Sequence, residues 1–432
     1  MRVLWFAEWQ PLAVQRRLSR TRDAGPEGWV ERLAEELRRD PGVTLAVATP
    51  TACPFAPFED DGVLYLGVPT AAPAARVARI AHAWRHHLTP PHVLAAGAQL
   101  ARDFGPDIIH VHGTEGAFGL LAGRVGGTPV VISLQGILRE YERQYFAGRS
   151  AAEVARLAAG TEFLKGRGAL HRYLLLRRQA AREACIMRGA RWFIGRTDWD
   201  RGVLAAANPR ATYFHCDEIM RVPFYAARWE PGGPGGSRIC TTSSALMGKG
   251  TECLLEALAL LQGRGVPGLR LRVAGVHPGS ELDGIYRRAA ARLGVADRVD
   301  WLGRLDAGGI VAELLAADAF AYPSYVDNSP NSLAEAMLVG VPTVASRVGG
   351  IPTLLKDGDE GLLFTPGDAG ALAAALGRLL DDRAAAARLG AAARVTATAR
   401  HDPRTVAAHT LAIYEEIVAR SRGARPAARG AA

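Results

Sequence analysis

Short apolar runs alternate with amphipathic stretches along most of the chain. The runs that we predict to be buried strands are residues 1–9, 43–48, 63–66, 107–112, 129–135, 191–195, 212–215, 239–242, 269–274, 299–302, 319–322, 341–345 and 361–364. Between many of them apolar residues recur at helical spacing, as Val30, Leu33, Ala34 and Leu37 do. Strands that alternate with helices across short turns are typical of parallel, doubly wound sheets. The pattern therefore predicts an α/β protein.

One cluster of breakers and two irregular stretches interrupt this alternation. Residues 231–237 read PGGPGGS, which predicts an interdomain linker. Because 432 residues are too many for one ordinary core, we expect a first domain over 1–230 and a second over 238–399. The arginine-rich residues 10–28 are expected to form a loop, and the charged residues 136–168 a lid or binding loop.

The stretch from 319 to 350 predicts a strand, a loop, a helix and a second strand. Ser329 is expected to be the N-cap and Pro330 the first helical residue, while Gly340 suits a left-handed residue at the helix end. The start of the helix then lies beyond the carboxyl end of a strand, where open α/β sheets bind ligands. The free N–H groups of Asn331 and Ser332 would face an anion there.

Three charged side chains lie near this predicted anion site. Asp327 precedes the helix and Glu335 lies inside it, although a purely structural unit needs neither carboxylate. A carboxylate can bind a diol such as that of ribose through two hydrogen bonds, and Asp327 would reach another part of the same ligand. Lys249 lies between glycines in a strand-to-helix turn, a suitable place to contact phosphate. The structural alternatives are a solvated helix face for Glu335 and a surface turn for Lys249.

These motifs resemble those of a known enzyme family. The segment YPSYVDNSPNSLAEAMLVGVPTVAS, followed by VGGIP, is similar to the E-x7-E signature of family 4 retaining glycosyltransferases of the GT-B fold. The motifs KG…LLEAL, VAG, WLGRL and DGDEGLLFTPGD stand in that family's order, and EGW and PDIIHVHG resemble its first half. The resemblance covers roughly residues 1–420. It implies two Rossmann-like domains that face each other across a cleft, with a last helix over 400–420 that packs back on the first domain. The tail 421–432 is rich in glycine, alanine and arginine and is predicted to be disordered.

The resemblance also implies roles in the second domain for particular residues. Glu335 would hold the ribose of a sugar nucleotide, and Asp327 stands where the family has its first motif glutamate, which contacts the transferred sugar. Lys249 and the amides near Asn331 and Ser332 would neutralise the diphosphate.

In the first domain, His112 would lie near the anomeric centre and the acceptor, and Gly28 would line the phosphates from the opposite side of the cleft. Of two histidines that alternate along one strand, His110 and His112, only one is expected to face the cleft.

Two departures from the family pattern affect these expectations. Asp327 is shorter than the usual glutamate. Ser244 lies among the predicted donor-binding residues where many members have an arginine, so one cation for the leaving group is missing; Arg196 or another basic residue would have to replace it. The motif Asp198–Asp200 resembles the metal-binding D-x-D of glycosyltransferases with the other fold, but acidic residues at a helix start are ordinary. We therefore expect no metal and no cofactor.

Composition narrows the classes of partner. The net charge of +9 suits phosphorylated substrates, a membrane surface or nucleic acid. Because no nucleic-acid-binding motif is present, we expect no nucleic-acid partner. The segment Trp84–His87 is interpreted as a solvated helix face, with a peripheral membrane contact as the alternative. Scattered cysteines, odd in number, and the lack of a signal peptide or membrane span favour the cytoplasm.

The function expected from the resemblance is metal-independent transfer of a hexose-type sugar, with retention, from a UDP- or GDP-sugar. The acceptor would be a glycan, a lipid-linked molecule or a small molecule. The alternatives are a non-catalytic partner protein that binds a sugar nucleotide, and a GT-B-type epimerase or phosphorylase.

Overall fold

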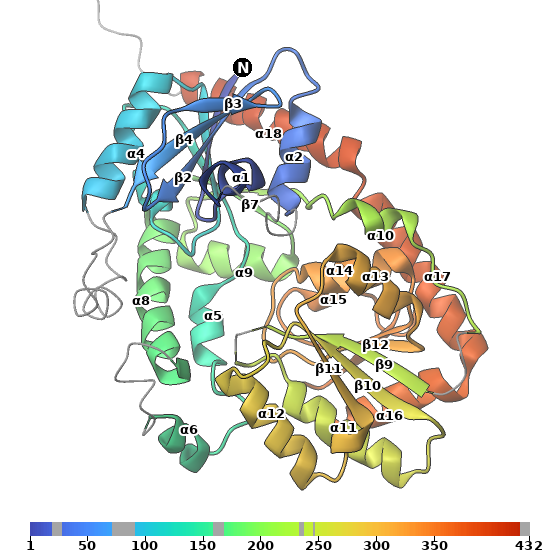
Figure 1. Ribbon diagram of the computed structural model, residues 1–432. Helices are drawn as coiled ribbons and strands as arrows, with labels where there is room; N and C mark the ends of the chain where they lie inside the picture. The colour runs from blue at the N-terminus through green and yellow to red at the C-terminus, as the bar shows by residue number, and fades with distance from the viewer. Residues whose placement is uncertain (20–27, 71–90, 159–167, 233–236, 245–246, 424–432) are drawn as a thin grey trace, which may run out of the picture.

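The computed structural model describes residues 1–19, 28–70, 91–158, 168–232, 237–244 and 247–423, which form two α/β lobes (Figure 1). The predicted membrane contact at Trp84–His87 lies outside the described residues, as do most of the linker and the end of the tail. The predicted loops over 10–28 and 136–168 lie partly outside them. No helix in the described ranges is long and apolar enough to cross a membrane.

The first lobe is built on a sheet in the order β3-β4-β2-β1-β5-β6-β7-β8. Its strands are β1 (Arg2–Ala7), β2 (Thr44–Thr51), β3 (Phe58–Asp60), β4 (Val63–Pro69), β5 (Ile108–His112), β6 (Val130–Ser133), β7 (Trp192–Gly195) and β8 (Thr212–His215). Neighbouring strands are parallel except β3 and β4. Its helices are α1 (Leu12–Ser19), α2 (Trp29–Leu37), α4 (Pro91–Phe104), η1 (Phe118–Leu121), α5 (Leu138–Arg143), α6 (Ala151–Ala158), α8 (Gly168–Gly189), α9 (Asp198–Ala207) and α10 (Val222–Ala226).

The second lobe contains a parallel sheet in the order β11-β10-β9-β12-β13-β14. Its strands are β9 (Ser237–Thr242), β10 (Leu269–Ala274), β11 (Val299–Gly303), β12 (Ala319–Tyr322), β13 (Thr343–Ser346) and β14 (Leu362–Phe364). Its helices are α11 (Thr251–Gly263), α12 (Glu281–Arg292), η2 (Ala296–Arg298), α13 (Ala307–Leu315), α14 (Asn331–Val339), α15 (Ile351–Leu354), α16 (Ala369–Asp381) and α17 (Arg383–Arg400). The two doubly wound sheets predicted from the alternation are confirmed.

The last helix, α18 (Pro403–Gly423), returns from the second lobe to the first. In Figure 1 it runs from the end of α17 up to the first lobe, where it lies beside α2. Its buried residues Ile413, Tyr414 and Ile417 belong to the same hydrophobic cluster as Val3 and Trp5 of β1. The helix includes residues 421–423, so the prediction that the tail is disordered from residue 421 onward is wrong for this stretch.

Two stretches predicted to be irregular contain helices instead. Residues 10–28 include α1, whose Ala13 and Val14 are buried in the core of the first lobe. Residues 136–168 include α5 and α6, and Leu138 of α5 is buried in a cluster shared with the second lobe. Helices α1 and α5 are short, so burial against the rest of the fold, rather than a long periodic pattern, stabilises them.

Candidate active site

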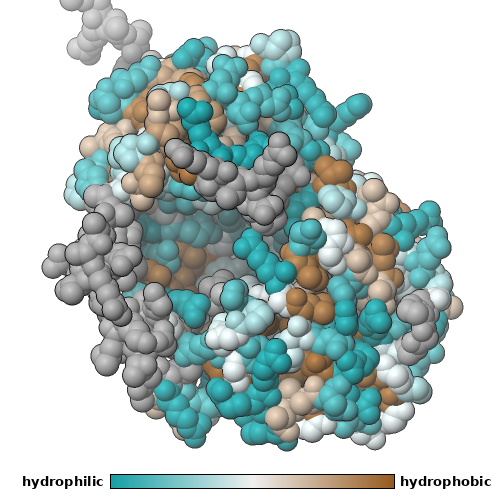
Figure 2. Space-filling view, viewed as in Figure 1, coloured by the Kyte–Doolittle hydropathy of each residue, from teal (hydrophilic) through white to brown (hydrophobic). Residues whose placement is uncertain are grey.

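Two adjoining pockets lie between the lobes, and Figure 2 shows a hollow there in which hydrophilic and hydrophobic residues are both exposed. The Glu335 pocket has a volume of about 430 Å³, and the Asp327 pocket about 540 Å³. Residues of both pockets come from both lobes, and five residues line both of them: Trp29, Lys249, Tyr322, Asn331 and Ser332. A ligand could therefore extend from one pocket into the other.

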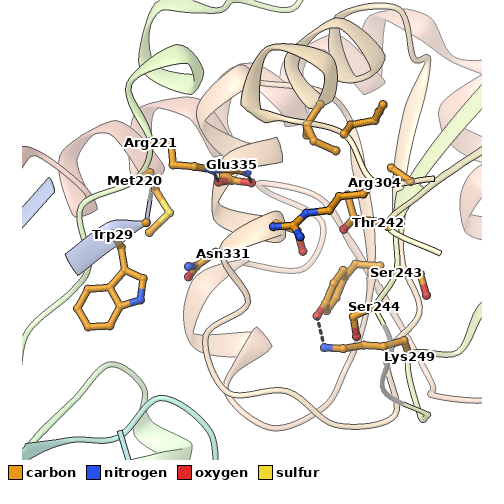
Figure 3. Close-up of a pocket in the computed structure, with 17 residues that line it drawn as sticks. Trp29, Met220, Arg221, Thr242, Ser243, Ser244, Lys249, Arg304, Asn331 and Glu335 are labelled. Atoms are coloured by element: carbon orange, nitrogen blue, oxygen red, sulfur yellow. Dashed lines mark hydrogen bonds and ion pairs between the residues drawn. The ribbon is translucent and has the colours of Figure 1, made fainter. Parts of the chain in front are cut away.

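The structure brings together every predicted site residue except His112. The predicted residues that line the Glu335 pocket (Figure 3) are Gly28, Ser244, Lys249, Asn331, Ser332 and Glu335. Asp327 lines the Asp327 pocket beside Lys249. These positions lie far apart in the sequence and meet because the carboxyl ends of the parallel strands share one edge of the sheet.

Lys249 is held by a turn that requires glycine. It lies between Gly248 and Gly250, which have φ angles of +82° and +71°. A Cβ on Gly250 would lie 1.8 Å from the carbonyl oxygen of Pro323, so only glycine allows α11 to begin this close to the end of β12. The turn thus delivers the lysine ammonium to the floor of both pockets.

Lys249 and Asp327 form a buried ion pair. The Nζ atom lies 2.6 Å from Oδ2 of Asp327, which also accepts a hydrogen bond from the hydroxyl of Tyr322. Tyr141 of α5, from the first lobe, donates to Oδ1 over 2.8 Å. Burial alone would raise the pKa of Asp327, but Lys249 and the two hydroxyls outweigh it and hold that pKa below its usual value. Both members of the pair are therefore charged.

Glu335 is held by a second, bidentate ion pair. Nε and Nη2 of Arg221 donate to the two carboxylate oxygens over 2.7 and 2.8 Å. Arg221 precedes α10, in the segment that joins the two lobes, and Figure 3 shows its side chain meeting Glu335 at one end of the pocket. Burial raises the pKa of Glu335, and Arg221 opposes that rise. Each oxygen keeps a lone pair that a ligand hydroxyl could use.

The start of α14 differs in detail from the prediction. Its N-cap is Pro330 rather than Ser329, the helix begins at Asn331, and no side chain caps it. The reason is that proline at this position has an extended backbone and no hydroxyl. Asn331 and Ser332 of the first turn line both pockets, and no side chain caps the N–H groups at this helix start, which suits an anion. At the other end Gly340 has a φ of +84°, as predicted.

His112 does not line either pocket within the part of the chain described. It is only 1% exposed, and its ring lies 5.3 Å from that of Trp29, which does line both pockets. Its ring also lies 3.9 Å from that of His110, because residues two apart in a strand share a face. The expectation that only one histidine faces the cleft is therefore wrong: both are buried on the same face. Burial first, and then the neighbouring charges, hold the pKa of His112 well below its usual value.

The structure also shows where Arg196 and the D-x-D motif lie. Arg196 lines the Asp327 pocket, where its guanidinium pairs with the buried Glu218, so it is not beside Ser244. The D-x-D carboxylates diverge: the side chain of Asp198 is 80% exposed, while Asp200 is buried and accepts hydrogen bonds from backbone N–H groups at the start of α9. Among the described residues no group of three potential metal ligands comes together.

The sequence interpretation missed several residues that line the pockets. They are Trp29, Tyr141, Arg221, Arg304 and Tyr322. Arg304 and Tyr322 stand within motifs that carried the family resemblance, WLGRL and YPSYVD, which is the signal that could have found them. Nothing in the local sequence marks Arg221 or Tyr141.

The sequence matches two family models that together reach across both lobes. Residues 24–184 match the model described as Glycosyl transferase 4-like domain, and residues 227–396 match Glycosyl transferases group 1. An MMP alpha-(1->4)-mannosyltransferase of Mycolicibacterium hassiacum is 36% identical over 173 residues, 40% of this chain and 41% of that protein. A glycogen synthase of Mycobacterium tuberculosis is 35% identical over 208 residues, 48% of each chain. The chain thus matches less than half the length of these curated relatives.

Solved structures resemble the whole chain. A sucrose-phosphate synthase of Thermosynechococcus elongatus covers 97% of this chain and all of its own, with a TM-score of 0.71 and 19% identity. HepE of Anabaena, solved with UDP, covers 96% of this chain and all of its own, with a TM-score of 0.65 and 17% identity. At such low identity these likenesses establish the fold, and the predicted GT-B architecture is confirmed.

Proposed function

Since the chain belongs to the family 4-type glycosyltransferases, we propose that it transfers a hexose-type sugar from a nucleoside diphosphate to an acceptor hydroxyl, with retention at the anomeric carbon. The observation that carries this proposal is the Glu335 pocket, in which a carboxylate, a lysine and an uncapped helix start converge from the second lobe. The acceptor would be a glycan, a lipid-linked molecule or a small molecule.

Each part of a sugar nucleotide has a matching group in the two pockets. The ribose diol would hydrogen-bond to Glu335, whose orientation Arg221 maintains. The diphosphate would lie between the N–H groups at the start of α14 and Lys249. The transferred sugar would extend into the Asp327 pocket, where Asp327 can accept a hydrogen bond from a sugar hydroxyl. HepE of Anabaena was solved with UDP and UDP-glucose, which supports a UDP-sugar as the first donor to test.

The proposed chemistry needs no metal. The bond from the anomeric carbon to the phosphate oxygen breaks, and the bond from the acceptor oxygen forms on the same face. The departing phosphate oxygen takes up the proton of the acceptor hydroxyl. Positive charge fixed around the diphosphate stabilises the charge that develops as it leaves.

The test is a donor panel of UDP-, GDP- and ADP-sugars, assayed for hydrolysis and for transfer to sugar, lipid and small-molecule acceptors. We expect turnover of one donor in the presence of EDTA, and NMR of the product should show the anomeric configuration of the donor. Glu335→Ala should abolish donor binding, whereas exchange of the exposed Arg288 should not. A chain that binds and turns over no donor, or for which Glu335→Ala changes nothing, contradicts the proposal.

Two observations favour a second candidate, a non-catalytic protein that binds a sugar nucleotide. His112, expected near the reacting centre, is shielded by Trp29, and Asp327 is already bonded to Lys249 and two tyrosines. Tight binding of a sugar nucleotide without hydrolysis or transfer to any acceptor would support this candidate over the enzyme.

A further inference from the structure

The cations of the Glu335 pocket differ in what they already bind. Three basic side chains line the pocket, namely Arg221, Lys249 and Arg304. Arg221 is paired with Glu335, and Lys249 with Asp327. Arg304 has no hydrogen-bond or ion-pair partner among the residues that the structure describes. It therefore carries the uncompensated positive charge of this pocket.

Arg304 is well placed for a ligand that spans the pocket. It follows β11 directly after Gly303, at the carboxyl edge of the second sheet, and it is exposed. Figure 3 shows its side chain reaching across the pocket, with the guanidinium between Glu335 at one end and Ser244 and Lys249 at the other. If Glu335 holds the ribose, the group that lies between these ends is the diphosphate.

The charge of a diphosphate requires more than the paired lysine can supply. The ammonium of Lys249 is 2.6 Å from Asp327, which neutralises most of its field at short range. A guanidinium can bind phosphate oxygens through two parallel hydrogen bonds, and its charge does not depend on pH in the physiological range. Ser244, which lines the same pocket, brings no charge.

We propose that Arg304 is the cation that binds the diphosphate of the donor and stabilises it as it leaves, in place of an arginine at position 244. The inference rests on the proposed function, because it assumes that a nucleoside diphosphate occupies the Glu335 pocket. The positive charge reaches the diphosphate from the turn after β11 rather than from the turn after β9.

The experiment compares nucleoside diphosphates with the nucleosides that lack the phosphates. Binding of UDP, GDP and ADP is measured by calorimetry, and binding of uridine, guanosine and adenosine by ligand-observed NMR. The proteins are the wild type, Arg304→Gln, Arg304→Lys and the control Arg288→Gln, which changes an exposed arginine of α12 that lines neither pocket. Because Arg304 is exposed and has no hydrogen-bond or ion-pair partner among the described residues, its variants should keep the wild-type melting temperature.

For the diphosphate that the wild type binds, we expect Arg304→Gln to raise Kd about 10- to 100-fold, the usual effect of losing hydrogen bonds to a charged group. The affinity for the matching nucleoside should stay within about twofold, Arg304→Lys should restore part of the loss, and Arg288→Gln should match the wild type. Higher salt should weaken the wild type more than Arg304→Gln.

Two results overturn the inference alone: an unchanged Kd for the diphosphate in Arg304→Gln, or an equal loss for diphosphate and nucleoside, which would place Arg304 at the base or ribose. A wild type that binds none of the three diphosphates overturns the proposed function instead, and the inference with it.

Discussion

Replacing Arg221 by methionine should leave the Glu335 carboxylate buried without a counter-charge. In the folded protein the side chain of Glu335 is 6% exposed and that of Arg221 is 21% exposed, and two hydrogen bonds of 2.7 and 2.8 Å join them. Methionine keeps most of the aliphatic length of arginine but removes both donors. The free energy of unfolding should fall, because a charge without a partner is costly in the interior.

The size of this loss is bounded by protonation. A carboxyl without a partner can take up a proton, and with an unfolded pKa of 4.5 this costs about 3 kcal/mol at pH 7, since one pKa unit corresponds to about 1.4 kcal/mol. At pH 5 the same bound is below about 1 kcal/mol. The pKa of Glu335 is already raised in the wild type, and in Arg221→Met it should rise further. The stability of the variant should therefore be highest at low pH and be lost as pH rises above 4.5.

Urea unfolding at pH 5, 7 and 8 tests this reasoning in the wild type, Arg221→Met, Glu335→Gln and the double variant. We expect Arg221→Met to cost about 2–3 kcal/mol at pH 7 and less at pH 5, and to cost little in the Glu335→Gln background. The control is Arg420→Met, which breaks an exposed pair with Glu416 and should change stability by less than about 0.5 kcal/mol. A loss from Arg221→Met that is the same at every pH, or the same with and without Glu335, would refute the explanation.

Three further variants probe the same site and its support. Asp327→Asn leaves the buried Lys249 without its counter-charge and should lower kcat for the donor at least about tenfold; an unchanged kcat would exclude a role for this carboxylate. Gly349→Ala places a Cβ 1.9 Å from the Asp327 carbonyl oxygen at a φ of +49° and should cost about 1–3 kcal/mol in urea unfolding. Gly294→Ala, at a φ of +68° with nothing within 4 Å, is its control and should cost less. Burial raises the pKa of Glu183 to about 7, so the stabilisation that its protonated form gives below pH 4.5 is lost as pH rises through 7. Glu183→Gln should remove up to about 3 kcal/mol of this pH dependence of the free energy of unfolding. Identical pH profiles of stability in the wild type and Glu183→Gln would contradict this explanation.

Local sequence was enough to predict the elements that carry the donor-side residues. The alternation of apolar runs with amphipathic stretches predicted both sheets, because burial between helices requires that pattern. The glycines around Lys249 and at the end of α14 marked backbone conformations that other residues avoid. Asp327 and Glu335 lie on one short loop and helix, so their spacing along the chain sets where their backbones lie.

The partners of these residues depend on the tertiary structure. Arg221 meets Glu335 across 114 positions, and Tyr141 meets Asp327 across 186, so no local pattern could pair them. The helices α1 and α5 form where the sequence suggested loops, because their apolar residues are buried by distant parts of the chain. His112 was placed on the correct strand, yet it is buried against the ring of Trp29, and Trp29 rather than His112 lines the pockets. The sequence by itself determined which groups reach the edge of each sheet, and the packing of the two lobes decided which of them are neutralised and which remain free to bind a ligand.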